Sequence, residues 1–77
     1  QAQALKQRVQ AEHPKDLDAQ LVRAFEHCAG RLPTSHERDM SHSFVRSMQE
    51  QEKLSLDRAL EHYCLLALNL NEFLYLD

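Results

Sequence analysis

Hydrophobic positions recur at helical spacing along most of the chain. Near the N-terminus, Ala2, Leu5 and Val9 mark one narrow apolar stripe, which predicts a first helix over Ala2–Glu12. Pro14 ends this pattern, because the residue before a proline is disfavoured in the α conformation. The first predicted helix is therefore short and amphipathic.

A second helix is expected over Lys15–Ala29, and Pro14 could occupy its first turn, where a missing N–H costs nothing. Gly30 follows it, as expected for a residue that ends a helix in the left-handed conformation. The apolar face of this helix comprises Leu17, Leu21, Phe25 and Cys28, with Val22 and Ala24 beside them.

A capping box predicts the start of the third helix. In Thr34-Ser35-His36-Glu37, the threonine is the expected N-cap and the glutamate reaches back to it. This helix should run to about Glu52, and Ser55 is the expected N-cap of a fourth helix that starts at Leu56. The apolar positions of the third helix are Met40, Phe44, Val45 and Met48.

The last helix carries more apolar side chains than one face can hold. Its heptad-spaced seam is Leu56, Leu60, Tyr63, Ala67, Leu70 and Leu74, and from Tyr63 to Leu76 eleven of fourteen residues are apolar. A helix that is apolar all round needs cover on all sides, and the other helices offer only narrow stripes. The seam can be covered from within the chain. The surplus comprises Leu65, Leu66, Leu68, Phe73, Tyr75 and Leu76.

Leaving this surplus in water would forgo roughly 1.5–3 kcal/mol for each large side chain. The apolar run is shorter than about 18 residues and contains Glu72, so a membrane span is excluded. Three explanations remain: a central core helix, a homodimer interface and a docking surface for another protein. We favour a protein interface formed by the surplus residues. A second candidate surface is formed by Met40, Phe44 and Met48.

Composition supports a single all-α domain of three or four helices over residues 1–77, which we expect to form a homodimer through its C-terminal helix. Glycine and proline together number three, valine occurs three times and isoleucine is absent, so no strand pattern is present. The N-terminus is polar and lacks the apolar core of a signal peptide. A reduced cytoplasmic setting is the expectation, and a chain that starts at Gln1 is compatible with an upstream segment.

The net charge argues against direct contact with nucleic acid, because the chain has nine Lys and Arg residues but twelve Asp and Glu residues. A helix-turn-helix module remains one alternative, with Arg38 and Arg46 on its reading helix. The turn Arg31–Thr34 is longer than that motif uses. A helical accessory domain of a larger protein is a further alternative.

Candidate chemistry is sparse, and we expect no enzyme activity, no metal and no cofactor. His36-Glu37 resembles the start of an H-E-x-x-H zinc helix, but Met40 stands where the second histidine belongs. A Cys28–His62–Cys64 cluster across two helices stays open. Both cysteines lie in apolar helical stretches, which raises a thiol pKa and makes the sulfur a poor nucleophile.

The leucine-rich end ALEHYCLLALNLNEFLYLD, over Ala59–Asp77, together with the small size, resembles the short all-helical quorum-sensing anti-activators of the QslA type. The resemblance includes no signature motif, so it assigns no role to an individual residue. It implies a homodimer that binds the ligand-binding domain of a LuxR-type transcription factor. Binding would block dimerisation of that factor and hence its attachment to DNA.

Overall fold

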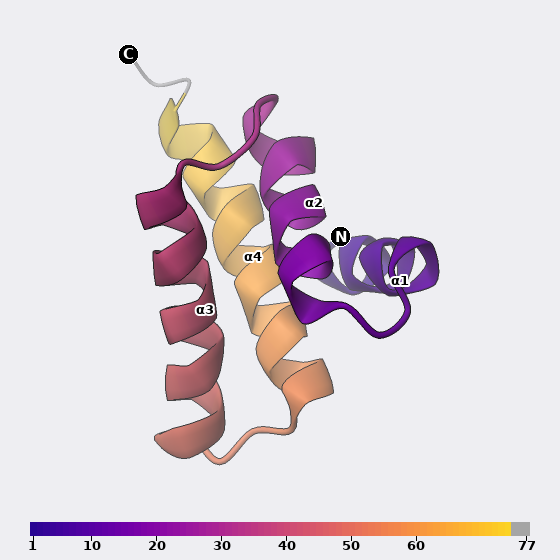
Figure 1. Ribbon diagram of the computed structural model, residues 1–77, viewed down its shortest axis with the longest axis vertical. Helices are drawn as coiled ribbons and strands as arrows, with labels where there is room; N and C mark the ends of the chain where they lie inside the picture. The colour runs from indigo at the N-terminus through magenta and orange to yellow at the C-terminus, as the bar shows by residue number, and fades with distance from the viewer. Residues whose placement is uncertain (75–77) are drawn as a thin grey trace.

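Four helices form the described part of the chain, as the sequence pattern predicted. The computed structural model describes the backbone of residues 1–74 and the side chains of residues 1–69. The helices are α1 (Ala2–Glu12), α2 (Leu17–Ala29), α3 (Ser35–Glu50) and α4 (Leu56–Leu74) (Figure 1). They pack into a compact all-α domain with a radius of gyration of 11.7 Å.

The last helix, α4, is the centre of the arrangement. It contacts each of the other three helices, whereas α1 and α3 do not touch within the described residues. In Figure 1, α2, α3 and α4 run lengthwise beside one another, and α1 lies across them at the side of α2. In this described part, no helix combines the length and the hydropathy that crossing a membrane requires.

Local capping interactions define the start of α2 and α3. The predicted capping box is confirmed: Glu37 N–H donates to Thr34 Oγ1 at 3.1 Å, and Thr34 N–H donates to Glu37 Oε1 at 2.8 Å. The predicted start of α2 is wrong by two residues, because Asp16 caps the helix by accepting a hydrogen bond from Ala19 N–H at 3.1 Å. Pro14 therefore precedes α2 and does not lie in its first turn.

Backbone conformation ends α2 and α3. Gly30 has φ of 77°, which confirms the predicted left-handed residue after α2. The third helix ends at Glu50, two residues before its predicted end. Lys53 then turns the chain with φ of 59°. The predicted cap of α4 is confirmed, since Ser55 Oγ accepts a hydrogen bond from Arg58 N–H at 3.2 Å.

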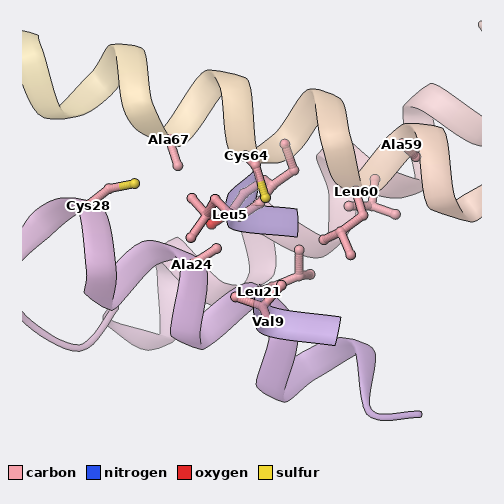
Figure 2. Packing of buried hydrophobic residues seen from close by; sticks show 11 residues of the cluster. Leu5, Val9, Leu21, Ala24, Cys28, Ala59, Leu60, Cys64 and Ala67 are labelled. Atoms are coloured by element: carbon pink, nitrogen blue, oxygen red, sulfur yellow. The ribbon is translucent and has the colours of Figure 1, made fainter. Parts of the chain in front are cut away.

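The hydrophobic core lies mainly between α1, α2 and α4. In Figure 2, Leu21 and Ala24 of α2 point toward Leu60 and Cys64 of α4. The predicted seam is confirmed at Leu60, Tyr63 and Ala67, which are buried, and wrong at Leu56, which is 44% exposed; its last two residues, Leu70 and Leu74, lie outside the described side chains. The core comprises Leu5, Val9, Leu21, Ala24, Cys28, Val45, Ala59, Leu60, Tyr63, Cys64 and Ala67.

A buried lysine links α1 to α4 through salt bridges. Lys6 is only 6% exposed, and its Nζ lies 2.8 Å from Asp57 Oδ2 and 3.5 Å from Glu61 Oε1. The hydrogen bond to Asp57 raises the pKa of Lys6 more than any other contact does. Gln10 Nε2 donates to the second oxygen of Asp57 at 2.9 Å. This polar link holds the crosswise helix in one register on α4.

Candidate functional site

An apolar groove opens between α2, α3 and α4, near the loop that joins α2 to α3. Its volume is about 350 Å³, within the range of sites that bind small groups. Its walls are almost entirely carbon and sulfur. The residues lining the apolar groove are Phe25, Cys28, Ala29, Arg31, Glu37, Met40, Ser41, Phe44, Tyr63, Leu66 and Ala67.

Two of the lining residues, Ser41 and Tyr63, are joined through their buried hydroxyl groups. Tyr63 Oη lies 2.7 Å from Ser41 Oγ, and Ser41 Oγ donates to the carbonyl oxygen of Glu37 at 2.9 Å. Either hydroxyl can be the donor of this pair, and Tyr63 is the donor when the serine proton is directed to Glu37. Burial raises the pKa of the Tyr63 hydroxyl, so the phenol stays protonated.

An ion pair closes one rim of the apolar groove. Arg31 donates two hydrogen bonds to the Glu37 carboxylate, at 2.9 Å and 3.0 Å. The Arg31 guanidinium also lies 5.2 Å above the ring centroid of Phe25. These contacts leave the rim electrically neutral. The hydrogen bonds from Arg31, followed by that from the Thr34 backbone, lower the pKa of the Glu37 carboxyl from 4.5 to about 2.

Acid should therefore weaken the domain through Glu37. A carboxyl group with a lowered pKa stabilises the fold above its unfolded pKa, and that contribution is lost as the pH falls from 4.5 to about 2. Glu37→Gln keeps an oxygen for the cap but removes the charge. In urea unfolding followed by circular dichroism, the difference between the wild-type and Glu37→Gln midpoints should shrink over this pH interval.

The matched control for this titration is Asp39→Asn, an exposed carboxylate on the same helix. Asp18 and Asp57 also have lowered pKa values, so the wild type alone cannot isolate Glu37. A difference between wild type and Glu37→Gln that stays constant with pH would contradict the assignment.

The two surfaces predicted from the sequence are only partly brought together. Met40 is 58% exposed, Leu66 is exposed across the apolar groove on α4, and Phe44 lies in its wall. Leu65 is exposed next to Leu66, whereas Leu68 and Met48 are half-buried against the core. The remaining predicted contacts lie outside the described side chains: Phe73, Tyr75 and Leu76.

The sequence did not identify the walls contributed by Phe25, Cys28 and Tyr63. All three were expected to face a core, because they follow the apolar periodicity of their helices; Cys28 and Tyr63 do lie in the buried core, and Phe25 is half-buried. That these residues also border an open space depends on the spacing of three helices, and periodicity within one helix carries no information about that spacing.

The two cysteines are poor nucleophiles and remain free thiols. Burial raises the pKa of Cys28 and raises that of Cys64 to about 12. Burial is the largest cause of both shifts, and the nearby charge of Lys6, which by itself lowers the pKa of Cys64, is outweighed by it. Among the described residues, no three His, Cys, Asp or Glu side chains gather into a metal site, so Cys28, His62 and Cys64 form no cluster of that kind.

A second polar cluster joins the start of α2 to α3. Arg38 Nη2 lies 2.6 Å from Asp18 Oδ2, and His42 Nε2 lies 2.7 Å from Asp18 Oδ1. The contact with His42, more than that with Arg38, lowers the pKa of Asp18. Arg38, which the helix-turn-helix alternative places against DNA, is thus paired with a carboxylate. This pairing weakens that alternative.

The apolar groove is the feature from which a function can be inferred. Its geometry combines aromatic walls, a neutral rim and an exposed mouth. No protein-family model, curated protein or solved structure matches the chain.

Proposed function

We propose that the domain is a non-enzymatic regulator that binds another protein through its apolar groove. The observation that supports this is the open, nearly carbon-lined space whose mouth exposes Met40 and Leu66. Covering large apolar side chains stabilises a complex by roughly 1.5–3 kcal/mol for each side chain that becomes fully buried. A partner that covers this mouth therefore gains affinity directly.

A helix is the shape that fits best. The apolar groove runs between α3 and α4, which lie lengthwise beside one another (Figure 1). A partner helix laid along them could insert apolar side chains at positions i, i+3 or i+4, and i+7. Leu65, exposed beside Leu66, would extend the contact along α4.

The narrower form of the proposal is an anti-activator of a LuxR-type transcription factor. It is supported by the resemblance of Ala59–Asp77 to the short quorum-sensing anti-activators. In this form, the domain, as a homodimer, occupies the surface through which the transcription factor dimerises. The factor then fails to dimerise and cannot hold DNA.

The test is calorimetric titration of the chain with the ligand-binding domain of a LuxR-type factor from the same organism. Met40→Glu places a charge at the mouth, and Leu56→Glu places the same charge at an exposed leucine at the other end of α4. Met40→Glu should weaken binding at least tenfold, about 1.4 kcal/mol, whereas Leu56→Glu should leave binding near the wild-type value. Circular dichroism checks that both variants fold.

Equal weakening by both variants would contradict binding in the apolar groove. No heat with the wild-type chain would remove the anti-activator form. The other candidate occupant is a second copy of this chain, and sedimentation of the chain alone tests it. A second copy fills the groove if the chain is a dimer, Met40→Glu dissociates that dimer and Leu56→Glu preserves it. A chain that neither dimerises nor captures any protein in a Met40-dependent way would overturn the proposal.

A further inference from the structure

We infer that a second copy of the chain lies along the open face of α4, antiparallel to it, so that the two copies of α4 cross at Leu65. This inference rests on the proposed function, in which the domain acts as a homodimer, and it names the residues that meet at the twofold axis. It assigns Leu65 to the second copy and leaves Met40, Leu66 and the apolar groove to the partner.

The central helix α4 has one face that no other helix covers. Both α1 and α3 pack against α4, yet they do not touch each other within the described residues. Around the helix, Leu65 lies between Glu61, which is paired with Lys6 of α1, and Leu66, which lines the apolar groove beside α3. Leu65 is 49% exposed, and Asn69, one turn further along, is exposed as well. Leu65 is therefore an apolar side chain in the middle of an open stripe.

The charges along this stripe are symmetric about Leu65. Arg58 comes seven residues before it and Glu72 seven residues after it, and positions seven apart share one stripe of a helix. Both positions belong to α4, and Arg58 is exposed. When two such helices lie antiparallel and cross at Leu65, position 58 of each copy comes level with position 72 of the other. Two pairs of opposite charge then flank the apolar centre.

The same antiparallel register suits the residues beside the stripe. Glu61 comes level with Asn69 of the second copy, whose side-chain amide can donate to the carboxylate. His62 comes level with Leu68 of the second copy, and both of these side chains are half-buried in the single chain. Leu65 meets its own copy at the axis. Among these paired positions, no like charges are opposed.

The charges also distinguish this arrangement from its alternatives. In a parallel pair, each residue would meet its own copy across the axis, so Arg58 would face Arg58 and Glu72 would face Glu72. Like charges placed opposite each other disfavour an interface. An unrelated protein could cover Leu65, but it would have no need of a charge pattern that is symmetric about that residue. The symmetry of the pattern therefore favours a second copy of this chain.

One helix pair makes a contact at the small end of specific interfaces. With 19 residues, α4 is about 28 Å long. Protein interfaces that bury less than about 1,200 Å² in total are typically weak. We therefore expect a dissociation constant for the dimer of about 1–100 µM.

Sedimentation equilibrium of the full chain, from about 1 µM to about 1 mM, measures this self-association. Leu65→Glu places two carboxylates against each other at the axis and should weaken the dimer by about tenfold or more. Leu56→Glu is the matched control, because it makes the same change on the same helix at a leucine that is 44% exposed. It lies nine residues before Leu65, on the opposite side of the helix, and should leave the dissociation constant near the wild-type value. Circular dichroism checks that both variants fold.

Charge reversal tests the register. Arg58→Glu and Glu72→Arg should each weaken the dimer by about 3- to 10-fold, because each turns two attractive pairs into two repulsive ones. The double variant Arg58→Glu/Glu72→Arg restores opposite charges and should return to within about twofold of the wild type. Net charge alone predicts a different result: Glu72→Arg changes the net charge from −3 to −1 and would by itself strengthen the dimer.

A chain that stays monomeric up to about 1 mM would overturn the inference. So would a dimer that survives Leu65→Glu, or two single charge reversals that the double variant does not rescue. A dimer that Met40→Glu dissociates would overturn it too, because the second copy would then fill the apolar groove.

Failure of the proposed function has a different signature. A dimer that responds to Leu65→Glu as expected, but binds no partner through Met40, would remove the proposed function and keep the contact between the two copies. A chain that stays monomeric yet binds its partner in a Met40-dependent way would keep partner binding through the groove and overturn the contact between copies.

Discussion

Replacing Leu60 by alanine should lower the free energy of unfolding by about 2–5 kcal/mol. Leu60 is 1% exposed and lies in the core on α4, the helix that contacts the other three. Truncation loses the transfer free energy of the side chain and leaves a cavity. A domain of 77 residues has a total free energy of unfolding of about 4–12 kcal/mol, so this variant should be only marginally stable. Urea unfolding followed by circular dichroism measures the change.

Leu56→Ala is the matched control for Leu60→Ala. It removes the same atoms one turn earlier on the same helix, from a side chain that is 44% exposed. The expected loss is within about 0.5 kcal/mol. Similar losses in the two variants would contradict the position of the core described above.

Cys64 should resist thiol reagents in the folded protein by several orders of magnitude. It is fully buried, and its pKa of about 12 leaves roughly one thiolate in 10⁴ at pH 8. Labelling must therefore wait for the domain to open. A time course with iodoacetamide, with peptides located by mass spectrometry, should show rapid labelling in urea and very slow labelling without it.

Cys28 is the internal control for this measurement. Its side chain lines the apolar groove, so iodoacetamide should modify it before Cys64. Native labelling of Cys64 at the rate seen in urea would contradict the packing of α4. Because the raised pKa of Cys64 keeps the neutral thiol in the folded state, its contribution to stability should also be lost as the pH rises from 9.0 towards about 12.

The helices and their caps were predictable because both depend on neighbouring residues. The capping box of Thr34 and Glu37 and the left-handed Gly30 are signals within a few positions. The start of α2 was mispredicted because two neighbouring residues can each mark the start of a helix. Pro14 is favoured within a first turn, and Asp16 is favoured as an N-cap. The side-chain bond of Asp16 decides between them.

Features that join distant segments were not predictable. Burial of Lys6 depends on carboxylates of α4 that lie 51 and 55 positions further along the chain. The buried position of Ser41 depends on Tyr63, which brings its hydroxyl across from α4. The apolar groove likewise depends on the gap between three helices. Exposure of Leu65 and Leu66 could be predicted, because α4 has more apolar side chains than the narrow apolar faces of the other three helices can cover.

The link between α1 and α4 has a consequence for synthesis on the ribosome. Lys6 is translated 51 residues before Asp57. At about 5–20 residues per second, this interval lasts about 3–10 s. During that time Leu5 and Val9 have no α4 to pack against, although both are buried in the finished domain. The nascent first helix is thus an apolar segment that a ribosome-associated chaperone could hold until the last helix emerges.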